Sequence, residues 1–86
     1  MIYKYLLGLG ENQTIQIPYG SEILSAQAQN GELCIWANIT PGYTIKRKIR
    51  VYAIGEPHVP GEKTRFIDTV QFNKGTFVVH VFEVLD

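Results

Sequence analysis

Apolar residues alternate with polar ones along most of this chain, and glycine, proline and asparagine interrupt the pattern at short intervals. A period of two places every second side chain on one face of a β-strand, whereas a helix needs a period near 3.6. Helical periodicity is absent. Short alternating segments separated by turn residues are typical of sandwiches and barrels. The sequence therefore predicts an all-β fold, a single small antiparallel sandwich or barrel of about six to seven strands.

The pattern predicts strands at residues 2–7, 14–18, 22–29, 32–39, 44–54, 64–72 and 76–85. No linker or repeat divides the 86 residues, so residues 1–86 are expected to form one β domain. A domain of this size buries only roughly 60% of its unfolded surface and often needs further stabilisation. A single cysteine excludes an intramolecular disulfide, and no Cys/His cluster has zinc-site spacing. Oligomerisation is the remaining source of stability.

The dipeptide Asn30-Gly31 predicts a hairpin with a two-residue turn. This turn places three pairs on one face: Ala28 with Leu33, Ala26 with Ile35, and Leu24 with Ala37. The opposite face collects Ser25, Gln27, Gln29, Glu32, Cys34, Trp36 and Asn38. Turn chemistry and alternation predict the same register independently.

A three-residue loop at residues 41–43 is expected to pair the strands at 32–39 and 44–54. It sets Ile39 against Ile45, Ile35 against Ile49, and Leu33 against Val51. The outer face then carries Lys48 opposite Trp36 and Arg50 opposite Cys34. Arg47 falls on the inner face opposite Ala37, where either its stem packs over the alanine or a bulge resets the alternation.

A turn at Asn73-Lys74-Gly75 predicts a last hairpin. Its expected pairs are Arg65 with Glu83, Phe66 with Phe82, Asp68 with His80, and Val70 with Val78. The expected core face holds Phe66, Val70, Phe72, Val78, Phe82 and Val84. The opposite face is apolar too, with Ile67, Phe77, Val79, Val81 and Leu85. A strand that is apolar on both faces is covered on both, and we expect the second cover from another subunit of a homo-oligomer.

One constellation favours ligand binding. Basic side chains beside flat aromatic rings hold a phosphate and stack a base. The outer face of the predicted pair of strands at 32–39 and 44–54 combines basic and aromatic side chains. The Pro- and Gly-rich loop at 55–63 is expected to add a histidine at the rim of this site. The expected ligand-binding residues are Trp36, Lys46, Lys48, Arg50, Tyr52 and His58. A subunit interface and a plain solvated face are equally good interpretations of the same pattern.

Catalysis, by contrast, has little support. Asp68 and His80 form the nearest approach to a catalytic pair, but no nucleophile or metal motif accompanies them, so we interpret them as a structural polar couple. Cys34 is interpreted as an inert small apolar residue. Gly8-Leu9-Gly10 precedes no helix and is no dinucleotide fingerprint. We expect no enzyme, no cofactor and no metal.

Charge, the N-terminal segment, the length of the apolar runs and the cysteine count disfavour several other classes. Eight basic and eight acidic residues give a formal net charge of zero, and non-specific nucleic-acid binding depends on neutralising phosphates. The N-terminus lacks the apolar core and cleavage site of a signal peptide. No apolar run approaches the ~20 residues of a membrane helix. A lone free cysteine fits a reducing cytoplasm.

Several segments resemble an uncharacterised family of small proteins common in phage and prophage genomes. They are Met1-Ile-Tyr-Lys-Tyr, residues 13–20 (Gln-Thr-Ile-Gln-Ile-Pro-Tyr-Gly), residues 23–31 ending in Asn30-Gly31, residues 33–37, and residues 75–83 with His80. Residues 40–63 are where such relatives differ most. The resemblance implies a phage-encoded protein in the host bacterial cytoplasm, and no activity comes with it.

This context favours a non-enzymatic counter-defence protein. In the first hypothesis a small oligomer sequesters a phosphate-bearing molecule, such as a signal nucleotide. In the second, the protein inhibits a host defence protein or takes part in virion assembly. In the third, it binds single-stranded nucleic acid, which the zero net charge disfavours.

Overall fold

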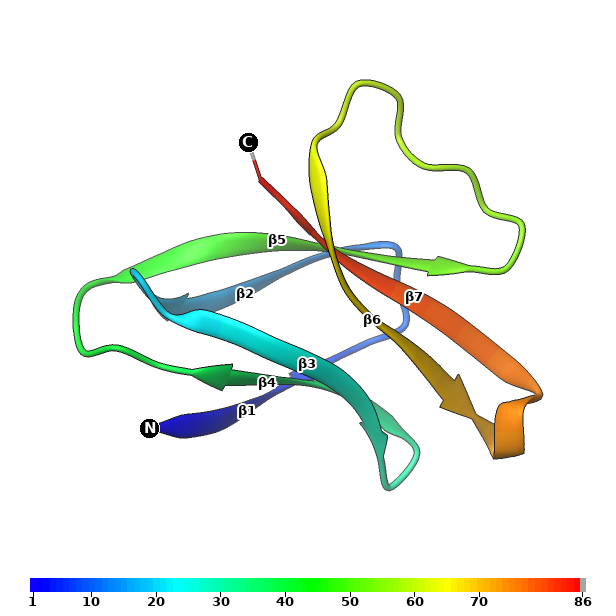
Figure 1. Ribbon diagram of the computed structural model, residues 1–86, viewed down its shortest axis with the longest axis horizontal. Coiled ribbons are helices and arrows are strands. Elements are labelled where there is room, and N and C mark those ends of the chain that lie inside the picture. The colour runs from blue at the N-terminus through cyan, green and yellow to red at the C-terminus, as the bar shows by residue number, and fades with distance from the viewer. Residues whose placement is uncertain (86) are drawn as a thin grey trace.

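The computed structural model describes residues 1–85, which fold into seven β-strands and one 3-10 turn (Figure 1). The elements in chain order are β1 (Ile2–Leu7), β2 (Asn12–Pro18), β3 (Glu22–Gln29), β4 (Glu32–Asn38), β5 (Thr44–Ala53), β6 (Thr64–Phe72), the turn η1 (Asn73–Gly75) and β7 (Phe77–Val84). Every expected strand is present, within two residues at each end. No helix in residues 1–85 is long and apolar enough to cross a membrane.

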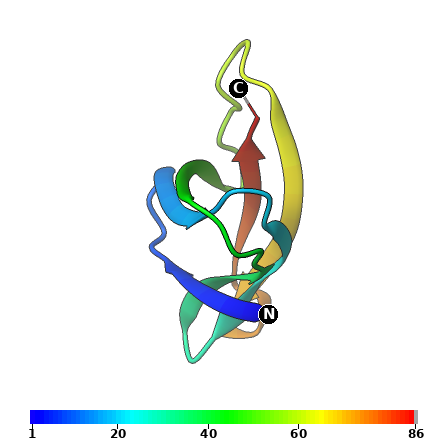
Figure 2. The same cartoon turned by 90° about the vertical axis from the view of Figure 1, so that its left-hand side faces the viewer.

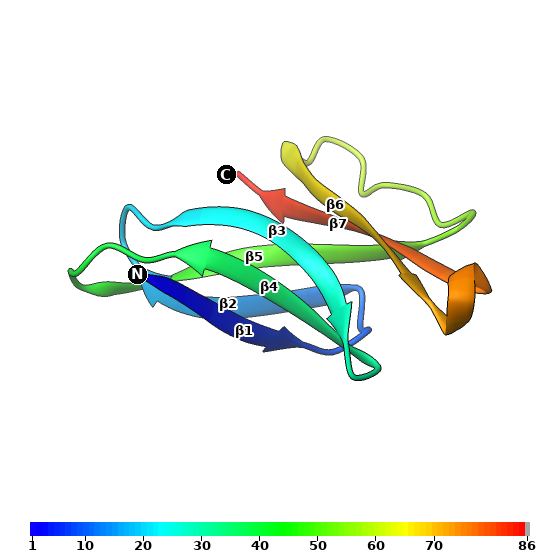
Figure 3. The ribbon, with the colours of Figure 1, turned by 60° about the horizontal axis from the view of Figure 1, so that its bottom comes forward.

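The strands form two antiparallel sheets that pack as a sandwich. One has three strands in the order β1-β4-β3, and the other has four in the order β2-β5-β7-β6. Figures 2 and 3 show the two layers, with the β6–β7 hairpin extending away from β1. Between the sheets lies one apolar cluster, built from inward-facing residues of all seven strands. The all-β sandwich prediction is therefore confirmed, and the barrel alternative is not needed.

The β3–β4 hairpin largely follows the prediction. Asn30 and Gly31 both have positive φ, 52° and 79°, as the two-residue turn requires. Ala28 pairs with Leu33 and Ala26 with Ile35. A bulge then interrupts β3, so that Ile23 rather than Leu24 lies opposite Ala37. The predicted Leu24 pair is wrong because the bulge turns Leu24 outward and buries Ile23 instead.

The expected β4–β5 hairpin does not form. β4 lies between β1 and β3, whereas β5 lies between β2 and β7 in the other sheet. The connection at 39–43 therefore crosses from one sheet to the other, and the ring of Tyr43 stacks on Tyr19 with centroids 5.3 Å apart. The expected pairs of Lys48 with Trp36 and of Arg50 with Cys34 are wrong. The faces of β5 are nevertheless as predicted, since Ile49 and Val51 are buried in the core and Arg47 shares their side.

The β6–β7 hairpin has two registers joined by a bulge at Ile67. Arg65 pairs with Glu83 and Phe66 with Phe82, as expected. Beyond the bulge the pairing shifts by one residue: Asp68 lies opposite Val81, Thr69 opposite His80, and Val70 opposite Val79. The predicted Asp68–His80 and Val70–Val78 pairs are wrong for this reason.

The face of β7 that enters the core is the opposite of the one expected. Val79 and Val81 are fully buried in the core, so Phe82 lies on the outer face. Part of its cover comes from the same chain. The loop at 54–63, which projects at the top of Figures 1 and 2, brings the ring of His58 to 4.7 Å from that of Phe82. Part of the cover that the sequence assigned to a second subunit therefore comes from the chain itself.

Candidate functional site

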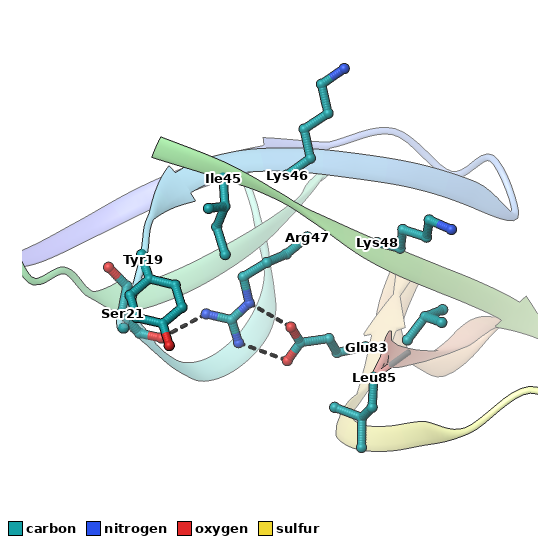
Figure 4. Close-up of a pocket in the computed structure, with 10 residues that line it drawn as sticks. Tyr19, Ser21, Ile45, Lys46, Arg47, Lys48, Glu83 and Leu85 are labelled. Carbon is teal, nitrogen blue, oxygen red and sulfur yellow. Dashed lines mark hydrogen bonds and ion pairs between the residues drawn. The ribbon is translucent and has the colours of Figure 1, made fainter. Parts of the chain in front are cut away.

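A cleft of about 550 Å³ opens beside the β2–β3 turn, between the start of β5 and the end of β7 (Figure 4). We call it the Arg47 cleft. Three segments line it: the turn after β2, the first half of β5, and the end of β7. The lining residues are Tyr19, Gly20, Ser21, Ile45, Lys46, Arg47, Lys48, Glu83, Val84 and Leu85.

The floor of the Arg47 cleft is an ion pair. Arg47 donates to both carboxylate oxygens of Glu83, from Nε at 2.5 Å and from Nη2 at 2.8 Å. Its third nitrogen, Nη1, donates to the main-chain oxygen of Ser21 at 2.6 Å. This forked arrangement is the strong, directional form of an arginine–carboxylate pair. It ties the β2–β3 turn to the two central strands of the larger sheet.

Glu83 has a second basic partner. Arg65 on β6 donates from Nη2 to Glu83 Oε1 at 2.8 Å. One buried carboxylate therefore holds two guanidinium groups, which come from the strands on either side of β7. The side chain of Glu83 is 6% exposed, and those of Arg47 and Arg65 are 17% and 45% exposed. These three groups together carry one surplus positive charge.

Strand alternation explains why these charges meet. Arg47 continues the inward series of Ile49 and Val51 on β5, and Glu83 continues that of Val79 and Val81 on β7. At this end of the two strands the inward positions carry charged groups in place of apolar ones, and the two charges compensate each other. Burial alone would raise the pKa of Glu83. The hydrogen bonds and charges of Arg47 and Arg65 outweigh burial and hold that pKa below its ordinary value.

The walls of the Arg47 cleft are aromatic and apolar. Tyr19 is 59% exposed and Leu85 is 57% exposed, although both stand beside the buried ion pair. One face of the Tyr19 ring stacks on the ring of Tyr43, which holds Tyr19 in place. An arginine at the floor, with a second arginine behind its carboxylate partner, lies beside an exposed ring and an exposed aliphatic chain. This combination is suited to a small molecule with one anionic group and one flat or apolar part.

The structure divides the predicted ligand-binding residues among three places. Trp36 lies on β4, between the buried core residues Ile35 and Ala37, so its side chain is on the outer face of the three-stranded sheet. The basic residues of β5 belong to the other sheet. The expected single face that combines Trp36 with Lys46, Lys48, Arg50 and Tyr52 therefore does not exist, because β4 and β5 are not neighbours.

Lys46 and Lys48 border the Arg47 cleft, but their side chains point to the other side of β5 from Arg47 (Figure 4). They form no ion pair with any residue of 1–85. Arg50, on the same outer face, is neutralised by Glu62 at 3.0 and 2.6 Å. Hydrogen bonding to Glu62 raises the pKa of Arg50. The outer face of β5 therefore offers two lysines and no uncompensated arginine.

Tyr52 and His58 form a closed aromatic cluster instead of an open stacking platform. Their rings stack at 4.7 Å, and Phe82 meets Tyr52 edge-on at 5.9 Å. Tyr52 is only 2% exposed, and its hydroxyl accepts the main-chain N–H of Val59 at 3.4 Å. Since its faces are occupied, Tyr52 has no free surface on which a base can stack.

The other chemical candidates are structural. His80 Nδ1 is hydrogen-bonded to the hydroxyl of Thr69 at 2.9 Å, while Asp68 accepts the main-chain N–H of Ala26 on β3 at 3.3 Å. Cys34 is buried and has no basic neighbour of the kind expected. Within residues 1–85 no group of three His, Cys, Asp or Glu side chains is arranged to hold a metal ion.

Sequence reasoning missed the cluster of Arg47, Glu83 and Arg65 as a site. Two signals were present: Arg47 was placed on the inner face, and Glu83 was paired with Arg65. An arginine and a glutamate that each interrupt an inward apolar series are buried charges, and buried charges need partners. That Arg47 and Glu83 meet each other depends on the adjacency of β5 and β7, which no local pattern specifies.

A family model described as "Domain of unknown function (DUF7352)" matches residues 1–86. No curated protein and no solved structure matches the chain. The chain therefore belongs to this family, whose function is unknown, and the predicted resemblance to an uncharacterised family is confirmed at that level.

Proposed function

We propose that this member of the DUF7352 family is a non-catalytic binding protein that holds a small anionic molecule in the Arg47 cleft. One observation carries the proposal: two arginines share the buried carboxylate of Glu83 and leave one surplus positive charge. Arg47 and Glu83 line the open cleft, and Arg65 contacts Glu83 from the neighbouring strand β6. Charge–charge attraction is stronger in such a partly desolvated position than on an open surface.

The ligand class follows from the chemistry of the cleft. The N–H groups of Arg47 that are not bonded to Glu83 or Ser21 favour an oxygen anion, either phosphate or carboxylate. The exposed Tyr19 favours a flat group next to that anion. A nucleotide has both features, so the sequestration of a signal nucleotide in bacterial counter-defence is the finer form of the proposal. A phage origin and a place in the host cytoplasm belong to that finer form.

Calorimetric titration tests the proposal. The panel is inorganic phosphate, mononucleotides, cyclic dinucleotides, ADP-ribose and an aromatic carboxylate, each titrated into the wild-type protein. We expect binding that weakens with added salt. The variant Arg65→Gln removes the surplus charge from a half-exposed position, and we expect it to weaken binding by about tenfold or more, or roughly 1.4 kcal/mol.

Two further variants locate the site. Lys74→Gln removes an exposed positive charge at the turn η1, at the other end of β7 from Glu83, and is expected to bind normally. The double variant Lys46→Gln/Lys48→Gln removes the charges on the outer face of β5. If the double variant abolishes binding while Arg65→Gln does not, the lysines hold the ligand and the cluster of Arg47, Glu83 and Arg65 does not, which contradicts the proposed site. If no compound of the panel gives a heat of binding with the wild-type protein, the proposal that this protein binds a small anionic ligand is rejected.

A specific observation favours a second candidate function, the inhibition of a host protein. An exposed apolar surface lies on the outer side of the β6–β7 hairpin and its neighbouring loop, with Phe66 54%, Ile54 76% and Val59 39% exposed. Phe66 packs edge-on against Phe82 with ring centroids 5.4 Å apart. Aromatic residues anchored in this way are typical centres of protein interfaces. Loss of a stoichiometric host partner on Phe66→Ser, but not on Leu24→Ser, supports this reading.

A further inference from the structure

Antiparallel sandwiches have sheet edges, and each edge exposes unpaired main-chain groups. Here the edge strands are β1 and β3 in the smaller sheet, and β2 and β6 in the larger. Natural proteins block such edges with charges, bulges, proline or covering segments. The four edges of this protein differ in how they are blocked.

Three of the edges carry a clear block. β3 and β6 lie side by side and are joined by the hydrogen bond from the main chain of Ala26 to Asp68. Both are also bulged, β3 next to Leu24 and β6 at Ile67. β1 carries the charged Lys4 at its centre.

β2 has no block along its length. Its sequence, Asn-Gln-Thr-Ile-Gln-Ile-Pro, contains no charged residue. It pairs with β5 in one unbroken register from Asn12 to Pro18, without a bulge. Its last residue is Pro18, which has no N–H and prevents strand pairing only at that end.

The hydrogen-bond pattern shows which groups of β2 face outward. Val51 donates to the oxygen of Glu11, and Tyr19 donates to the oxygen of Tyr43. In an antiparallel pair, alternate residues form the bonded pairs, so odd-numbered residues of β2 bond to β5. The N–H and C=O groups of Asn12, Thr14 and Gln16 therefore point away from β5. Pro18 continues this even-numbered series, and it has no N–H to leave unpaired.

We infer that β2 is a dimerisation edge, which pairs antiparallel with β2 of a second copy of this chain. The twofold arrangement that uses all three outward-facing residues sets Thr14 opposite Thr14 of the second copy, and Asn12 opposite Gln16. These pairs are neutral and self-complementary, as an interface between identical surfaces requires. The two four-stranded sheets then join into one continuous sheet. This inference does not rest on the proposed ligand.

Sedimentation over a concentration series tests the inference on the whole protein. We expect the wild type to form a species of twice the 9.7 kDa chain mass. Thr14→Glu places two like charges at the twofold axis and is expected to remain monomeric, as is Thr14→Lys. The control Gln27→Glu adds the same charge on β3 and is expected to dimerise normally. Thermal melts establish that each variant is folded.

The decisive measurement mixes the two charged variants in equal amounts. Because Thr14 faces its own copy across the axis, a Glu chain and a Lys chain are expected to form a heterodimer where neither forms a homodimer. Hydrogen exchange of the wild type should show concentration-dependent protection of the Thr14 and Gln16 amides. The inference is overturned if the wild type is monomeric at every concentration, if Thr14→Glu dimerises as well as the wild type, or if the mixture stays monomeric.

Discussion

The buried carboxylate of Glu83 provides the sharpest test of how this fold is held together. The change Glu83→Gln keeps the size of the side chain and removes its charge. In the wild type this carboxylate accepts three charge-assisted hydrogen bonds, two from Arg47 and one from Arg65. The amide retains a single acceptor oxygen, and its NH2 group is turned toward guanidinium donors. Arg47 is then left largely buried without a counter-charge.

The magnitude follows from the exposure of each partner. The side chains of Glu83 and Arg47 are 6% and 17% exposed, which places this pair near the buried regime, where removing one partner costs about 3–5 kcal/mol. Arg65 is 45% exposed, so its contact adds less than about 1 kcal/mol. We therefore expect Glu83→Gln to lower the free energy of unfolding by about 3 kcal/mol, and the melting temperature by roughly 12–24 °C.

Urea unfolding, followed by the fluorescence of the single tryptophan Trp36, measures this change. Glu32→Gln is the matched control, because it is the same substitution at an exposed position without an ion pair, and it should shift stability by less than about 0.5 kcal/mol. A loss below about 1 kcal/mol for Glu83→Gln would show that the cluster behaves as a surface ion pair and would refute the reasoning.

The pH dependence of stability provides an independent check. The pKa of Glu83 is lower in the folded protein than its ordinary value of 4.5. The folded state therefore binds the proton less readily than the unfolded state, and Glu83 contributes full stability above pH 4.5. This contribution is lost as the pH falls from there through the folded pKa. The stability difference between the wild type and Glu83→Gln should accordingly be largest at neutral pH and shrink on acidification; a difference that does not shrink contradicts the assignment.

Three smaller changes test other parts of the fold. Gly31→Ala meets no atom within 4 Å but keeps a φ of 79°, so it should cost about 1–2 kcal/mol in urea unfolding through backbone strain alone; an unchanged midpoint contradicts the two-residue turn. His58→Ala removes the ring stacked on Tyr52 and should cost about 1 kcal/mol, with faster hydrogen exchange in the surrounding loop but not in β4. Asp68→Ala leaves the N–H of Ala26 unpaired and should cost about 1 kcal/mol, whereas equal stability would mean that the contact between β3 and β6 does not need this bond.

Much of the fold was predictable because it depends on local rules. The strands follow from alternation, and the β3–β4 turn follows from Asn30-Gly31, whose positive φ angles only a few residue types adopt readily. The inward position of Arg47 also follows from alternation along β5. The candidate site was less predictable. Of its charged groups, only the pairing of Arg65 with Glu83 was reached from the turn, and the role of Arg47 required knowledge of a distant strand.

The errors share a physical cause. A bulge inserts one residue and reverses every face beyond it, so one unpredicted bulge at Ile67 moved Asp68 away from His80. β7 is apolar on both faces, and alternation cannot state which face enters the core. The packing decides this, since the β-branched Val79 and Val81 fill the space between the sheets while Phe82 is covered by His58.

Alone, the sequence determined where the strands lie, to within two residues at each end, and the two-residue turn at Asn30-Gly31, because these properties depend on residues a few positions apart. Only the tertiary structure decided which strands are neighbours. It placed β4 and β5 in different sheets and thereby separated Trp36 from the basic strand. It also placed β5 beside β7 and so brought Arg47 to Glu83. Strand order depends on how well the whole apolar core is buried. That burial is the sum of contacts between residues far apart in the sequence, so no single segment of the sequence predicts it.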